Sequence, residues 1–198
     1  MRIIGGMAAG LLIKVPKGYE VRPTPDLVRQ AIFNSLGPRV AGARVLDLFS
    51  GSGALGLECL SRGAASVLSV ERSNRNAAMI RQNLGAVHLP AEQFELRIQD
   101  VFTAIGQLAE QGREFDLIMA DPPFGEKNIG VRSRSASQQL LDEERLPQLL
   151  AREGLFVLGH TKRDTLSLPG HWREVKVMKH GDSMMRFLAE SVGSSREM

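Results

Sequence analysis

Cysteine, aromatic residues and long apolar runs are all scarce in this chain of 198 residues. A single cysteine, Cys59, excludes an intrachain disulfide and suits a reducing cytoplasm. No run of about 18 apolar residues occurs, and the first 18 residues lack an uninterrupted apolar signal segment. The composition, with 43% hydrophobic and 24% charged residues, is that of a globular protein. The single cysteine and the lack of long apolar runs lead us to expect a cytoplasmic protein with no membrane partner, and we expect it to be a monomer.

The basic residues are unevenly distributed, although the net charge is only +3. Residues 1–40 contain six basic residues against two acidic ones, and residues 125–138 contain three against one. Such segments beside an active site suit a polyanionic partner such as a nucleic acid. Ordinary solvated surface charge is the alternative interpretation.

From residue 43 onward, strand-like apolar runs alternate with helix-like segments. The strand-like runs are 43–49, 66–71, 94–100, 115–121 and 154–160. The helix-like segments are 54–62, 73–84, 101–111 and 137–152. This alternation predicts an α/β fold with a parallel, doubly wound sheet. Two further strands, 172–179 and 183–190, are separated by a short turn and should form an antiparallel pair, which makes seven strands.

The first 40 residues lack this alternation and predict an accessory unit. Residues 2–21 indicate a short β-hairpin. The stretch RPTPDLVRQAIFNSLGP, residues 22–38, indicates a helix with Thr24 as its N-cap and Pro25 at its first position.

A glycine-rich loop follows the first strand of the main sheet. In DLFSGSGALGLE, residues 47–58, Gly51, Gly53 and Gly56 satisfy the pattern G-x-G-x-x-G. Glycines let the backbone approach a ligand, and the start of the following helix offers free N–H donors. Glu71 ends the next strand and can accept both hydroxyls of an adenosine ribose. The pattern therefore favours an adenosine cofactor, either NAD or S-adenosylmethionine, over a tight turn without a ligand.

Two further carboxylates bear on the choice of cofactor. Asp47 lies at the strand end before the glycines, where it suits the ammonium and sulfonium groups of S-adenosylmethionine better than a pyrophosphate. Asp100 ends the third strand and could reach the adenine amino group, cap the helix that starts at Val101, or do both.

The stretch IMADPPFGEK, residues 118–127, ends an apolar strand on Asp121. Two prolines stop the strand, because neither has a backbone N–H and both fix φ near −65°. The Asp121 carboxylate and the Pro122 carbonyl can accept the two hydrogens of an exocyclic amine, and Phe124 offers a face on which a splayed base stacks. The fourth strand should lie beside the first, so Asp121 should emerge next to the reactive end of the cofactor. We therefore expect an amine methylation site; a proline turn with Phe124 in the core is the alternative interpretation.

Five segments together resemble the RsmD family of bacterial 16S ribosomal RNA guanine-N2 methyltransferases. The segments are RIIGG at 2–6, RPTPDLVRQAIFN at 22–34, DLFSGSGALGLECLSRGA at 47–64, DPPF at 121–124 and HGDSMMRF at 180–187. The resemblance implies a Rossmann-like, seven-stranded class I methyltransferase sheet with an antiparallel last strand. It also implies an N-terminal unit over 1–40, a methyltransferase domain over 41–190 and a frayed tail over 191–198.

The resemblance assigns two groups of site residues and no metal. S-adenosylmethionine would be bound by Asp47, Ser50, Gly51, Gly53, Glu71 and Asp100. The guanine would be held by Asp121, Pro122 and Phe124. The implied partner is 16S ribosomal RNA or a small-subunit particle.

The chain departs from the family pattern after RIIGG, where a segment rich in arginine and lysine is usual. Here the segment is MAAGLLIK, with Lys14 as its one basic residue. Either the RNA contacts have moved to the long basic loop 125–137, or the exact target differs from that of the family. The candidate RNA-binding residues are Arg22, Arg29, Lys127, Arg132 and Arg134. The alternatives are an adenine-N6 methyltransferase acting on DNA or RNA, an NAD-dependent oxidoreductase, and a non-enzymatic RNA-binding assembly factor.

Overall fold

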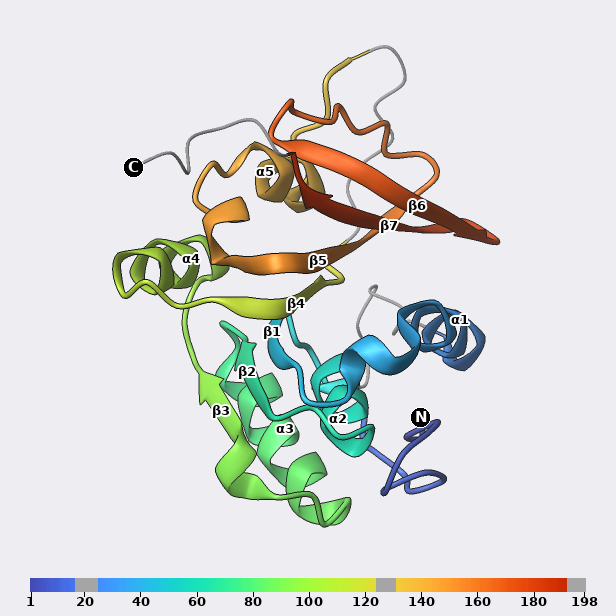
Figure 1. Cartoon of the computed structure of the whole chain (residues 1–198). Helices are drawn as coiled ribbons and strands as arrows, with labels where there is room; N and C mark the ends of the chain where they lie inside the picture. The colour runs from blue at the N-terminus through green and yellow to red at the C-terminus, as the bar shows by residue number, and fades with distance from the viewer. Residues whose placement is uncertain (17–24, 124–130, 192–198) are drawn as a thin grey trace.

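One seven-stranded sheet forms the centre of the protein, within residues 1–16, 25–123 and 131–191 that the computed structural model describes (Figure 1). Its strand order is β3-β2-β1-β4-β5-β7-β6. The strands are β1 (Arg44–Leu48), β2 (Ser66–Val70), β3 (Phe94–Arg97), β4 (Phe115–Ala120), β5 (Leu150–Thr161), β6 (Trp172–His180) and β7 (Ser183–Glu190). Strands β1 to β5 pair in parallel, and β7 lies antiparallel between β5 and β6. The predicted sheet and its antiparallel last strand are confirmed.

Helices cover both faces of the sheet. They are α1 (Asp26–Leu36), α2 (Ala54–Ser61), α3 (Asn74–Ala86), α4 (Val101–Glu110) and α5 (Ala136–Asp142). The described residues also form three short 3-10 helices, which are η1 (Gly37–Val40), η2 (Ala91–Gln93) and η3 (Pro147–Leu149). Because successive strand residues point to opposite faces, β1 supplies Val45 to the cluster under α1 and α2, and Leu46 to the cluster under α4 and α5.

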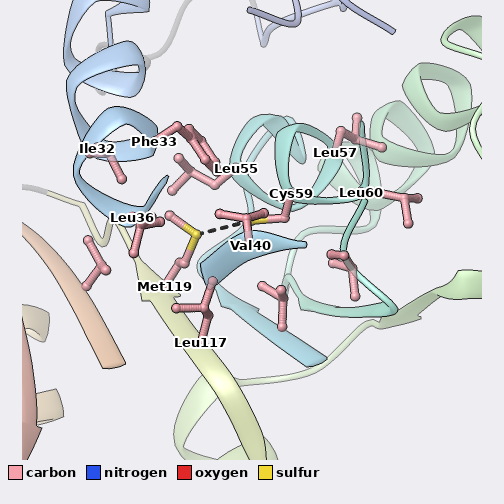
Figure 2. Packing of buried hydrophobic residues seen from close by; sticks show 14 of the residues in the cluster. Ile32, Phe33, Leu36, Val40, Leu55, Leu57, Cys59, Leu60, Leu117 and Met119 are labelled. Carbon is pink, nitrogen blue, oxygen red and sulfur yellow. Dashed lines mark hydrogen bonds between the residues drawn. The ribbon is translucent and has the colours of Figure 1, made fainter. Parts of the chain in front are cut away.

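The first of these clusters packs α1 and α2 against β1 and β4 (Figure 2). Phe33 and Leu36 from α1 lie near Leu55 from α2, and the Cys59 thiol lies 3.5 Å from the Met119 sulfur. Burial and the nearby carboxylates raise the pKa of the Cys59 thiol well above its usual value. Cys59 is therefore a core residue rather than a reactive one.

Two predicted elements are corrected. The helix expected over 137–152 ends at Asp142, and the segment returns to extended backbone at Glu143. Proline in a helix interior lacks the N–H and clashes with the carbonyl four residues earlier, so Pro147 is incompatible with a helix through this stretch and instead opens η3. Helix α1 begins at Asp26, one residue later than expected; Pro25 precedes it, and Thr24 lies outside the described residues.

The predicted N-terminal hairpin is reduced, in residues 1–16, to one bridge between Arg2 and Leu12. The backbone between them turns toward α2 instead. The N–H groups of Ile4 and Gly5 donate to the Glu58 carboxylate at 2.8 and 2.9 Å. The N-terminal segment is thus fastened to the helix that follows the glycine loop.

No helix in the part of the chain that the structure describes is long and apolar enough to span a bilayer.

Candidate active site

Four acidic residues follow, or lie at, the carboxyl ends of four neighbouring strands. The strand order β3-β2-β1-β4 places Asp100, Glu71, Asp47 and Asp121 along one edge of the sheet. Asp47 pairs in register with Ser69 on one side and with Met119 on the other. The expected neighbourhood of β1 and β4 is therefore confirmed, and this edge is where open α/β sheets bind ligands.

The glycine loop turns sharply between β1 and α2. Gly51 and Gly53 adopt φ values of 57° and 79°, in the left-handed region that favours glycine. Phe49 also has φ 56°, an uncommon backbone for an aromatic residue, so the chain is strained where it leaves β1. The N–H of Gly53 donates to the carbonyl of Ser50 at 2.7 Å, which closes the turn.

Asp47 is a buried carboxylate whose two oxygens differ in their hydrogen bonds. Its side chain belongs to a residue only 1% exposed, and Oδ2 accepts from the Gly56 N–H at 3.2 Å and from the Ser69 hydroxyl at 3.3 Å. Burial, with a smaller contribution from the charge of Glu71, raises the pKa of Asp47 to about 7. Oδ1 is buried with no hydrogen-bond partner among the described residues. A cationic group would satisfy this oxygen and favour the ionised form.

Gly56 makes room for that carboxylate. A Cβ at Gly56 would lie 2.9 Å from Asp47 Oδ2 and 3.0 Å from Ser69 Oγ. The third glycine of the pattern is therefore required by close packing of α2 on β1 and β2 and not by its backbone angles.

Glu71 joins the end of β2 to the glycine loop. Its Oε2 accepts from the Gly51 N–H at 2.9 Å, and its Oε1 accepts from the Ser73 N–H at 2.8 Å. An ionised carboxylate has about four acceptor positions, so two remain for other donors, such as ribose hydroxyls.

Asp100 is exposed and caps α4. Its Oδ1 accepts from the N–H groups of Phe102 and Thr103 at 3.0 and 3.1 Å. The capping interpretation is confirmed, and contact with an adenine stays a prediction.

Asp121 leaves β4 beside Gly159 of β5. A Cβ built at Gly159 would lie 2.4 Å from Asp121 Oδ1, so the carboxylate occupies space that only glycine leaves open. Pro122 is buried, Pro123 is exposed, and β4 ends at Ala120, before the two prolines, as expected. Phe124 lies outside the described residues, and its role stays a prediction.

His160 lies next to Gly159, and both of its ring nitrogens are engaged. Arg186 Nε donates to Nε2 at 3.1 Å, and Nδ1 lies 2.9 Å from the carbonyl of Thr161. Burial and the charge of Arg186 lower the pKa of His160. The ring is therefore a neutral structural group at neutral pH.

The predicted RNA-binding residues separate into three groups. Arg132 and Arg134 are exposed; Arg132 pairs with Asp142 at 2.6 Å. They precede α5, whose Ser137 donates to the Gly159 carbonyl at 3.3 Å, so they lie near the same edge of the sheet as Asp121. Arg22 and Lys127 lie outside the described residues.

The prediction that Arg29 contacts RNA is wrong, because its side chain is fully buried. Its guanidinium donates to Asp26 Oδ1 at 2.9 Å and lies 3.6 Å from Glu58 Oε2. Glu58 is also fully buried and pairs with Arg62 at 2.7 Å. Arg29 thus compensates a buried carboxylate that holds the N-terminal segment on α2.

Sequence reasoning missed three contributors to the site, Ser69, Gly159 and Asn83. The first could have been found by aligning the predicted strands, which places Ser69 beside Asp47. Asn83 lies one turn after the buried Ile80 on α3, a polar residue at an apolar position. Gly159 had no local signal, because its neighbour Asp121 is distant in the sequence. In the described part of the chain, no cluster of three or more His, Cys, Asp or Glu side chains could hold a metal ion.

The sheet order, its antiparallel β7 and the glycine loop at the carboxyl edge define the class I methyltransferase fold. A solved structure of the hypothetical protein TTHA0928 from Thermus thermophilus shares this fold with a TM-score of 0.78 and 28% identity, over 96% of this chain and 99% of that one. The family described as Conserved hypothetical protein 95 matches residues 1–189, and the chain belongs to that family. The resemblance to RsmD-type methyltransferases is thereby confirmed.

Two curated relatives support the same family. The protein named "Putative rRNA methyltransferase YlbH" of Bacillus subtilis strain 168 is 35% identical over 162 residues, which cover 82% of this chain and 83% of the relative. Ribosomal RNA small subunit methyltransferase D of Escherichia coli K12 is 38% identical over 124 residues, which cover 63% of this chain and 60% of the relative.

Proposed function

We propose that the protein transfers a methyl group from S-adenosylmethionine to the exocyclic N2 amine of one guanine in 16S ribosomal RNA, on an assembled small-subunit particle. One observation carries the proposal. Asp121 leaves β4 beside the strand whose end holds Asp47 and the glycine loop, so an acceptor for an amine adjoins a site suited to a cationic cofactor. The names of both relatives specify ribosomal RNA, and that of the Escherichia coli relative also specifies the small subunit, which supports the substrate class.

The residues of the glycine loop fit this cofactor. When bound, S-adenosylmethionine supplies an electrophilic methyl group on a positively charged sulfur. The unpartnered Asp47 Oδ1 suits a cation, and the remaining acceptor positions of Glu71 suit the ribose hydroxyls. Ser50, Gly51 and Gly53 shape the backbone around them, and exposed Asp100 is the candidate for the adenine amine.

Asp121 and Pro122 would bind the acceptor amine. The guanine N2 amine is a poor nucleophile because its lone pair is delocalised into the ring. Hydrogen bonds from its two hydrogens to the Asp121 carboxylate and the Pro122 carbonyl would favour a pyramidal nitrogen and stabilise the positive charge that develops on it. Phe124 would stack on the guanine.

Methyl transfer to small-subunit particles tests this function. Purified protein and labelled S-adenosylmethionine are incubated with particles from a strain lacking the gene, with the naked 16S RNA and with duplex DNA. We expect labelling of the particles first of all. Labelling of DNA alone would favour the adenine-N6 alternative, and no labelling of any substrate would favour a non-enzymatic assembly factor.

Glu71→Ala is expected to weaken S-adenosylmethionine binding by roughly 1–3 kcal/mol, because the ribose hydroxyls lose charged acceptors and the Gly51 N–H loses its partner. Calorimetric titration measures the change. Glu92→Ala, which removes an exposed glutamate from η2, is the matched control. Unchanged affinity in a folded Glu71→Ala variant would show that Glu71 does not bind the cofactor.

Gly159→Ala is expected to slow methyl transfer on the order of tenfold, because the added Cβ displaces the Asp121 carboxylate, while cofactor affinity stays near wild type. Single-turnover rates and calorimetry measure the two quantities. Gly170→Ala is the control, since a Cβ there meets no atom within 4 Å. Equal rates for the two variants would mean that the position of Asp121 does not matter.

Replacing Lys127, Arg132 and Arg134 together by alanine is expected to reduce the dependence of RNA affinity on salt, because each lost phosphate contact lowers the slope by about one. Binding titrations at several salt concentrations measure it. Replacing Arg39, Arg113 and Arg152, three exposed arginines near the opposite edge of the sheet, removes the same charge as a control. If both triple variants change the slope equally, the 127–134 charges are ordinary surface charge.

A further inference from the structure

Asn83 on α3 makes three hydrogen bonds to backbone groups far away in the sequence. The N–H of Lys14 donates to its Oδ1 at 2.8 Å, and its Nδ2 donates to the carbonyl of Lys14 at 2.9 Å. The same Nδ2 donates to the carbonyl of Ser52, also at 2.9 Å. Asn83 is only 1% exposed. One buried amide therefore connects the N-terminal segment to the glycine loop.

A buried asparagine at this position is not explained by packing. The neighbouring buried residues on the same face of α3 are Ala77 and Ile80, and an apolar residue would continue that stripe. Asparagine instead pairs with the N–H and the carbonyl of Lys14, as a neighbouring strand would. It also donates to the Ser52 carbonyl. Its removal would leave three backbone groups without their partner.

The loop end of this connection lies at the centre of the proposed cofactor site. Ser52 stands between Gly51 and Gly53, the two residues whose positive φ values shape the turn. Glu71 holds the loop from the other side through the Gly51 N–H. A ligand that shifts or fixes this turn must therefore act on the Ser52 carbonyl and, through Asn83, on Lys14.

At its other end, the connection made by Asn83 reaches Lys14, the basic residue of the segment MAAGLLIK. The Lys14 Nζ donates to Gln82 Oε1 at 3.3 Å on the surface of α3, whereas its backbone is held by Asn83. The two contacts are thus separable, because Gln82 binds the side-chain charge and Asn83 binds the main chain.

We propose that Asn83 is a positioning residue that couples the cofactor loop to the N-terminal segment at Lys14. Occupation of the loop then stabilises the backbone at Lys14, and by reciprocity an ordered Lys14 backbone favours the occupied loop. The proposal rests on the proposed function in one respect, that the glycine loop binds S-adenosylmethionine.

Amide hydrogen exchange at Lys14, with and without S-adenosylhomocysteine, tests the coupling in the wild-type protein. We expect the Lys14 N–H to exchange severalfold more slowly when the ligand is bound. Asn83→Ala should lower the affinity for S-adenosylhomocysteine about tenfold and abolish the response at Lys14. Gln82→Ala, which removes only the surface contact to the same lysine, should leave both as in wild type.

The outcomes separate the coupling from the function beneath it. Ligand binding by the wild type without any change at the Lys14 amide would overturn the coupling, whether or not Asn83→Ala folds. A folded Asn83→Ala variant with wild-type affinity would overturn it as well. No binding of S-adenosylhomocysteine by the wild type would overturn the proposed cofactor and the coupling together.

Discussion

Asp121→Ala is expected to slow methyl transfer by about a hundred- to a thousandfold, while cofactor affinity stays close to wild type. The carboxylate is placed to accept a hydrogen bond from the acceptor amine and to stabilise the charge that develops on it. It emerges from β4 into space kept open by Gly159, one strand away from the glycine loop of β1. Single-turnover methylation of undermethylated small-subunit particles measures the rate, and calorimetry measures cofactor binding separately.

The same strand supplies the control for this prediction. Asp116 lies at the opposite end of β4, where it pairs with Arg44 at 3.0 Å. Asp116→Ala removes a carboxylate from the same element without touching the proposed site, so its rate should match wild type. A rate for Asp121→Ala within threefold of wild type would make the two prolines a structural turn and exclude this mechanism.

Asp47→Asn is expected to have opposite effects on cofactor binding and on the stability of the cofactor-free protein. Binding should weaken at least tenfold, because the cationic cofactor loses a buried negative partner. The free energy of unfolding at pH 8 should rise by an amount on the order of 2–4 kcal/mol, because the neutral amide does not have to be ionised in a buried site. Calorimetric titration and denaturant unfolding measure the two changes.

The pH dependence of the wild-type free energy of unfolding tests the same effect of Asp47 on stability. The pKa of Asp47 is about 7 in the folded protein, whereas in the unfolded chain it has its ordinary value near 4. The stability from this group is thus complete below pH 4 and is lost as pH rises to about 7, a loss that Asp47→Asn should not show. An Asp47→Asn variant that is less stable than wild type at pH 8 would contradict this account of the site.

The sequence was sufficient to predict the sheet and the position of the acidic residues at its carboxyl edge. Alternating apolar runs and helical segments indicate parallel strands, and parallel strands place their carboxyl ends together. Asp47, Glu71 and Asp121 could therefore be assigned to one edge from the pattern alone. The antiparallel β6–β7 pair followed from a short turn, which leaves no room for a crossover helix.

The features that sequence reasoning missed depend on contacts between distant residues. Arg29 has the appearance of a surface charge on α1, and its buried position is explained by contacts with Asp26, the Arg2 carbonyl and the buried Glu58 of a different helix. Asn83 and Gly159 likewise acquire their roles from Ser52 and Asp121. The prediction of a helix through Pro147 was wrong because it assigned an apolar run that includes the start of β5 to that helix.

The most direct test of the central claim is to identify the nucleoside that is methylated in the particles. After reaction with labelled S-adenosylmethionine, the 16S RNA is digested to nucleosides, and the methylated nucleoside is identified by mass spectrometry. The proposed site predicts one N2-methylguanosine per RNA with wild type and almost none with Asp121→Ala, although that variant still binds the cofactor. Methyl groups on adenine N6, or full methylation by Asp121→Ala, would contradict it.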